Sequence, residues 1–121
     1  TTPELGGELD CGAHSIGFTA QSATGDGTTT IDWKLGNLFH FTFQDFTNET
    51  FTFTAPTNPG VFVLKLIQNS DDGASSATWP ASVKWPGGTA PTITATVSAV
   101  DVVRFYYDGT NYYGTFEQNF S

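Results

Sequence analysis

Residues 105–116, FYYDGTNYYGTF, contain the clearest fold signal in the sequence. Asp108 and Gly109 supply the residue types of a tight turn, and a Tyr-Tyr pair stands on each side of that turn. Cross-strand aromatic pairs of this kind stabilise a hairpin by roughly 0.2–1 kcal/mol each. The stretch therefore predicts a β-hairpin.

Upstream of the hairpin, apolar and polar residues alternate with the period of a half-buried β-strand. In residues 37–43, NLFHFTF, three phenylalanines share one face. In residues 48–56, NETFTFTAP, two phenylalanines face one way and the threonines face the other, a composition that suits a pleated sheet. Residues 28–36, TTTIDWKLG, alternate in the same way, and we expect Trp33 to lie in the core.

Other segments complete an all-β prediction. Residues 60–68, GVFVLKLIQ, are almost continuously apolar, so we expect a central strand covered on both faces. Residues 93–97 and 101–107 are expected to be further strands, and residues 17–30 a loop or an edge segment. About eight short strands separated by turns are typical of an antiparallel β-sandwich, here jelly-roll-like.

The length of 121 residues fits one domain of ordinary size. Residues 1–16 carry Pro3 and a Gly-Gly pair and lack helix signals. We therefore expect an extended N-terminal arm over residues 1–16 and a β-sandwich domain over residues 17–121.

Charge and the lack of a long apolar run argue against nucleic acid and membrane as partners, and the cysteine content excludes an internal disulfide. The formal net charge is −8, from 12 acidic and 4 basic residues, which repels the phosphates of nucleic acids and anionic lipid surfaces. No apolar run approaches the ~18 residues of a membrane span. Cys11 is the sole cysteine, so no internal disulfide can form, and we expect an inert packing residue there rather than a nucleophile. Neither nucleic acid nor membrane is an expected partner.

Residues that could perform chemistry are few and scattered. His14 and His40 are the two histidines, and their spacing matches no metal motif. Asp71 and Asp72 lack the alternate-oxygen spacing of a calcium loop, which favours a solvated turn. We therefore predict no catalytic, cofactor-binding or metal site, and we do not expect an enzyme.

Two tryptophans stand in residues 77–88, ATWPASVKWPGG. Trp79 and Trp85 are six residues apart, and on a continuous strand they would share a face that could stack a sugar ring. Each precedes a proline, however, which holds its neighbour extended and confines the segment to the edge or end of a sheet. We favour the interpretation that both rings brace such an edge, where they could also face a neighbouring subunit.

Several of these segments resemble proteins of tailed bacteriophages. Residues 1–18, TTPELGGELDCGAHSIGF, resemble a stretch that recurs in phage virion proteins. The runs TFTAPTNPGVFVLKLIQ, ATWPASVKWPGGTAPT and DVVRFYYDGTNYYG resemble a β-domain of tail-fibre-like and capsid-surface proteins. The resemblance spans nearly the whole chain and is most specific in WPASVKWPGGTAP and in the hairpin. Residues 11–13 depart from it, since an Asn-Gly turn is usual there.

This resemblance implies a non-enzymatic virion component without a cofactor, assembled as a homotrimer in the host bacterial cytoplasm. The first hypothesis is a capsid decoration (cement) protein on the outer particle surface, which ties capsomers together. Its arm would contact the major capsid protein, and the candidate contact residues are Thr2, Pro3, Leu5 and Leu9.

Two alternatives remain open at this point. The chain could be the tip of a tail fibre, a receptor-binding domain joined to a fibre shaft, with a host surface glycan as an additional candidate partner. It could instead be a carbohydrate-binding module attached to a secreted enzyme. The aromatic residues that could serve surface or subunit contacts are Trp79, Trp85, Tyr112 and Tyr113.

Overall fold

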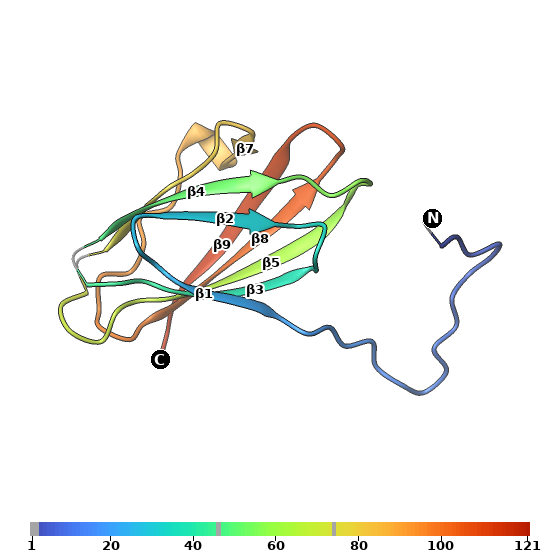
Figure 1. Ribbon diagram of the computed structural model, residues 1–121, viewed down its shortest axis with the longest axis horizontal. Helices are drawn as coiled ribbons and strands as arrows, with labels where there is room; N and C mark the ends of the chain where they lie inside the picture. The colour runs from blue at the N-terminus through green and yellow to red at the C-terminus, as the bar shows by residue number, and fades with distance from the viewer. Residues whose placement is uncertain (1–2, 46, 74) are drawn as a thin grey trace.

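The structure is a computed structural model that describes residues 3–45, 47–73 and 75–121. Within these residues it has nine strands and one short 3₁₀ turn at Pro86–Gly88, so the all-β prediction is confirmed (Figure 1). The strands are β1 (Gln21–Thr24), β2 (Thr28–Asp32), β3 (Leu38–Thr42), β4 (Asn48–Thr54), β5 (Gly60–Ile67), β6 (Ser76–Thr78), β7 (Val83–Lys84), β8 (Val100–Tyr107) and β9 (Tyr112–Phe120).

The first six strands alternate between two sheets. β1, β3 and β5 pair in parallel in one sheet, and β2, β4 and β6 pair in parallel in the other. After each strand the chain crosses to the opposite sheet and then returns beside its previous pass (Figure 1). This connectivity is that of a β-solenoid, in which each turn of the coil packs on the turn before it.

The C-terminal strands extend the larger sheet in a different way. β8 runs antiparallel to both β5 and β9, and β7 pairs in parallel with β9 at the edge. The order of this sheet is β1-β3-β5-β8-β9-β7. The predicted hairpin is confirmed: Tyr106 pairs with Tyr113, Tyr107 pairs with Tyr112, and the Asp108 N–H donates to the Asn111 carbonyl at 3.1 Å.

The jelly-roll-like antiparallel sandwich is not what the structure contains. Among the described residues, five of the seven strand pairings are parallel and two are antiparallel. Period-two alternation identifies a strand and its buried face, but it is the same in a parallel and in an antiparallel pair. The pairing partners are chosen by contacts between distant segments, which the local pattern does not contain.

Three segment predictions need correction. β5 is central in its sheet, but only one of its faces is packed, and Val61 on the other face is exposed. Residues 93–97 form no strand; Thr94 instead binds the Asp101 carboxylate through its N–H (2.8 Å) and its hydroxyl (2.7 Å). The strand expected over residues 28–36 ends at Asp32, and Trp33 lies in the following turn with its ring in the core. The segment predicted as loop or edge holds β1, which is indeed an edge strand.

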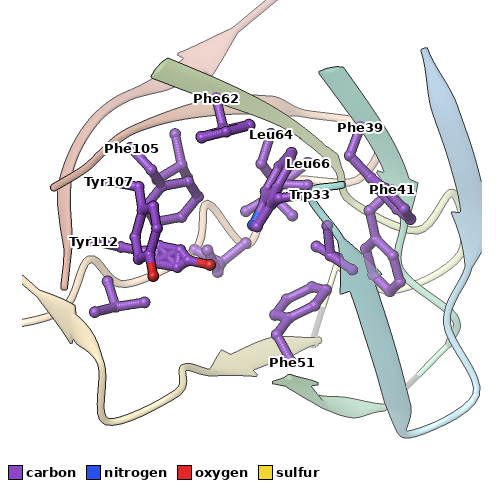
Figure 2. Close-up of a cluster of buried hydrophobic side chains, with 14 of the residues drawn as sticks. Trp33, Phe39, Phe41, Phe51, Phe62, Leu64, Leu66, Phe105, Tyr107 and Tyr112 are labelled. Atoms are coloured by element: carbon purple, nitrogen blue, oxygen red, sulfur yellow. The ribbon is translucent and has the colours of Figure 1, made fainter. Parts of the chain in front are cut away.

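The core lies between the two sheets and is mainly aromatic (Figure 2). Phe41 of β3 meets Phe51 of β4 edge to face, with ring centroids 4.9 Å apart, so the rings join the two sheets directly. Trp33 packs against Phe62 at 5.2 Å, as expected for a core residue. Burial of each such side chain stabilises the fold by roughly 1.5–3 kcal/mol. The predicted inward set Phe39, Phe41 and Phe43 is confirmed.

A fully buried carboxylate ties successive turns of the coil. Glu49 of β4 accepts hydrogen bonds from the Gly27 N–H at 2.9 Å and from the Thr29 hydroxyl at 2.7 Å. A Cβ on Gly25 would come within 2.5 Å of this carboxylate, so glycine leaves the room that it occupies. A buried acid with such partners fixes how the loop before β2 sits on β4.

The N-terminal segment stands apart from the sheets. Residues 3–20 contain no strand and are exposed, except for half-buried Cys11 and Ala20 (Figure 1). In the view of Figure 1 this blue segment leads away from β1 toward the N-terminus. It includes the described part of the arm predicted over residues 1–16. No helix among the described residues is long and apolar enough to cross a membrane.

Candidate functional site

The arm presents its predicted contact residues to solvent. Thr2 lies outside the described residues, whereas Pro3, Leu5 and Leu9 are all exposed. Local hydrogen bonds shape the arm: the Asp10 carboxylate accepts from the Gly12 N–H at 2.8 Å, and the His14 N–H donates to the Cys11 carbonyl at 3.2 Å. An extended segment with exposed leucines is suited to contact another surface.

Two further apolar residues of this segment were not predicted as contacts. Ile16 and Phe18 are 58% and 55% exposed, close to the 60% of Leu9. Their spacing of two residues, just before the first strand, was the available signal, because such a pair shares one side of extended backbone.

Trp79 and Trp85 lie half-buried at the border of the core. The Trp79 ring stacks on Phe51, with centroids 5.1 Å apart and an interplanar angle of 23°. Trp85 meets the edge of Trp79 at 5.3 Å and also contacts Phe105 at 6.0 Å. This geometry matches rings that brace an edge of the core, and the Phe51 ring covers one face of Trp79.

Gly114 allows this packing. A Cβ at that position would lie 2.5 Å from the Trp85 ring, which is closer than real Cβ contacts come. The glycine that follows the second Tyr-Tyr pair therefore serves close approach of the indole to β9.

The two tyrosines of that pair have opposite environments. Tyr112 is only 2% exposed and packs against Tyr107 (4.5 Å) and Phe53 (5.0 Å), so its prediction as a surface aromatic is wrong. Burial raises the pKa of Tyr112 to about 12, with a contribution from Tyr107. Tyr113 is 46% exposed and stacks on Tyr106 across the hairpin, with centroids 6.4 Å apart. Neighbouring residues on a strand face opposite sides, so the pair could not share one role.

Tyr106 and Tyr113 belong to a larger exposed surface. We call it the outer face, and we define it by ten outward side chains of β5, β7, β8 and β9: Val61, Val63, Lys65, Lys84, Val102, Arg104, Tyr106, Tyr113, Thr115 and Glu117. The strand register places Val61, Tyr106, Tyr113 and Lys84 in one row across the sheet. The next row contains Val63, Arg104 and Thr115. Aromatic, aliphatic and cationic groups thus lie side by side.

The charge of the outer face is opposite to that of the chain. Three of the four Lys and Arg residues of the sequence lie on it, together with one acid, Glu117. The Lys84 ammonium donates to the Ala81 carbonyl at 3.0 Å, and beside it Trp85 and Tyr113 line a shallow depression of about 300 Å³. Such a surface favours an anionic partner that also carries apolar groups.

Near β3 and β5, a second polar cluster joins two loops. The Asn69 side-chain oxygen accepts hydrogen bonds from the N–H groups of Asp71 (3.0 Å) and Asp72 (2.8 Å), which gives that loop a fixed turn. A hydrogen bond in which protonated Asp45 donates to the Asp72 side chain raises the pKa of Asp45 to about 6, with contributions from desolvation and from the negative charges of Asp72 and Asp71.

The remaining candidates are dispersed. His14 is exposed in the arm, and His40 is exposed on β3. Among residues 3–45, 47–73 and 75–121, no three His, Cys, Asp or Glu side chains are grouped so as to hold a metal ion.

No family of proteins, no curated protein and no solved structure is found to match this chain. The arm and the outer face are the features most suited to binding, that is, to non-covalent contact with another molecule.

Proposed function

We propose that this protein is a homotrimeric structural component of a bacteriophage virion, a decoration protein on the outer capsid surface that ties capsomers together. The observation that carries this proposal is the arm, an extended segment that exposes Leu5 and Leu9 beside a well-packed domain. Exposed apolar side chains on extended backbone are suited to bind another protein. The resemblance of the arm and of the Trp-Pro and hairpin segments to phage virion proteins supplies the class of particle.

The interior of the domain also supports a structural role. The buried carboxylates of Glu49 and Asp101 accept hydrogen bonds from backbone N–H groups and hold neighbouring segments in place. The aromatic core needs no disulfide, which suits assembly in a reducing cytoplasm.

The first experiment removes the arm. Deletion of residues 1–10 is expected to abolish binding to phage capsids while the domain stays folded, because residues 3–10 lie outside the core. Leu5→Ser with Leu9→Ser should reduce binding in the same direction. Leu35→Ser is the matched control, since Leu35 is exposed but lies between β2 and β3. Normal capsid binding by the folded deletion variant would overturn the proposal.

A fibre-tip role is the second candidate, favoured by the exposed stack of Tyr106 on Tyr113. Exposed aromatic faces can contact a host glycan, and the arm would then lead to a fibre shaft. Gold-labelled antibody against the domain separates the two roles, because capsid-wide labelling favours decoration and labelling of the tail alone favours a fibre tip.

The third candidate, a carbohydrate-binding module, finds less support. The tryptophans that would stack a sugar are packed against Phe51 and Phe105. Measurable glycan affinity of a monomer, lost on Trp85→Ala, would favour it over both virion roles.

A further inference from the structure

Two exposed surfaces of this chain have complementary chemistry. Residues 3–20 carry three carboxylates and no lysine or arginine. The same segment exposes four large apolar side chains: Leu5, Leu9, Ile16 and Phe18. This segment is thus both acidic and apolar, and no surface among the described residues covers it.

The outer face has the opposite charge and matching apolar groups. Lys65, Lys84 and Arg104 lie on it, against the single acid Glu117. Its apolar row contains Val61, Tyr106 and Tyr113, which are 59%, 52% and 46% exposed. The one basic residue elsewhere, Lys34, lies in the turn after β2. Opposite charges at this density steer two surfaces together and fix their register.

We propose that residues 4–18 of one copy bind across the outer face of a second copy of this chain. The apolar side chains of the arm would cover the row formed by Val61, Tyr106 and Tyr113. The carboxylates of Glu4, Glu8 and Asp10 would lie near Lys84 and Arg104. This inference rests on the oligomeric part of the proposed function and assigns the contact that builds the oligomer.

The length of the arm is sufficient for this contact. Fifteen extended residues span roughly 50 Å, whereas the distance from β5 to β7 is about 15 Å at the usual strand spacing. A neighbour is favoured over the arm's own sheet because the arm leaves β1, at the edge opposite β7, and leads away from it (Figure 1). Its leucines, Ile16 and Phe18 accordingly stay exposed within one copy.

The test measures self-association by sedimentation equilibrium on the full chain. Lys84→Glu with Arg104→Glu is expected to raise the dissociation constant at least tenfold, and Lys34→Glu is the matched control with no such effect. Glu8→Lys with Asp10→Lys should weaken association similarly. All four substitutions in one chain exchange the two charges, so they should recover most of the lost affinity. All altered side chains are exposed, and thermal unfolding verifies that each variant is folded.

The outcomes separate this contact from the wider function. An oligomer whose dissociation constant is unchanged by both charge reversals would overturn the arm contact and leave the virion role intact. A monomer at every concentration would overturn the contact as well, whether the arm folds on its own sheet or binds only a capsid. Gold labelling of particles tests the virion role independently. Weakening by each reversal and recovery in the exchanged chain would support the contact.

Discussion

The coil formed by β1 to β6 and the hairpin formed by β8 and β9 build one core by different means. In the coil, residues from separate turns become neighbours, as when Phe39 pairs with Gln21 on one side and Leu64 on the other. In the hairpin, Tyr107 meets Tyr112 across a short turn. The coil therefore depends on long-range packing and the hairpin on local pairing, and the two should respond differently to substitution.

Removal of a buried ring from the coil should have the largest effect. Phe41 is fully buried and contacts Phe43 and Phe51. Phe41→Ala is expected to lower the free energy of unfolding by about 3–5 kcal/mol, because it loses transfer energy and leaves a cavity between the sheets. Denaturant unfolding measures it, with Phe120→Ala, at an exposed position of β9, as a control that should change little. A loss under about 1 kcal/mol would contradict the assigned role of Phe41 in joining the sheets.

The buried carboxylate of the coil comes next. Glu49→Ala should cost about 2–3 kcal/mol, since the Gly27 N–H and the Thr29 hydroxyl lose their acceptor in a buried site. Glu49→Gln keeps an acceptor oxygen and should cost less. Glu117→Ala, on the solvent side of β9, provides the matched acid control in the same unfolding assay. Equal stability of the Glu49→Ala and Glu117→Ala variants would show that the coil does not need this acceptor.

At the hairpin, the packing of Trp85 on β9 can be tested by a double-mutant cycle. Gly114→Ala is expected to cost about 1–3 kcal/mol, because the new methyl group overlaps the indole ring. In a Trp85→Ala background the same change should cost much less, so the two effects should not add. Gly6→Ala, in the arm where a Cβ meets nothing, is the control. Additive effects would mean that the glycine serves another purpose.

The smallest expected effects are on the pH dependence of stability. They should have opposite signs beside the coil, at Asp45, and in the hairpin turn, at Asp108. The pKa of Asp45, beside the coil, is raised from 3.8 to about 6, so its protonated form stabilises the folded state. That contribution is complete below pH 3.8 and is lost as pH rises through about 6. Asp45→Asn should therefore remove a decline in melting temperature between pH 4 and 6. An unchanged decline would contradict the raised pKa of Asp45.

Asp108 in the hairpin turn provides the contrast. Hydrogen bonds from the N–H groups of Asn111 and Thr110 lower the pKa of its carboxyl. Its contribution is present above pH 3.8 and is lost as pH falls through the lowered pKa. The melting temperature of Asp108→Ala should accordingly approach that of the unaltered chain in acid and fall behind it at neutral pH.

The candidate surfaces were predictable only in part. Exposure of Leu5 and Leu9 is consistent with the extended arm predicted from Pro3, the Gly-Gly pair and the absence of helix signals, and exposure of Tyr113 is consistent with its prediction as a surface aromatic. Both Tyr112 and Tyr113 were predicted to lie on the surface. Consecutive strand residues face opposite ways, so only one of the two could be exposed. The cationic outer face required the strand order, since Lys65, Lys84 and Arg104 come from three different strands.

The sequence alone determined that the chain is all-β, that Phe39, Phe41 and Phe43 face inward, and where the hairpin turns. These properties depend on period-two alternation and on turn residues such as Asp108 and Gly109, which act over a few neighbouring positions. Only the tertiary structure decided that the strands coil in parallel between two sheets, and that Trp79 and Trp85 pack on the border of the core. Both depend on contacts between residues far apart in the chain, where total burial and hydrogen bonding select among pairings that the local pattern permits equally.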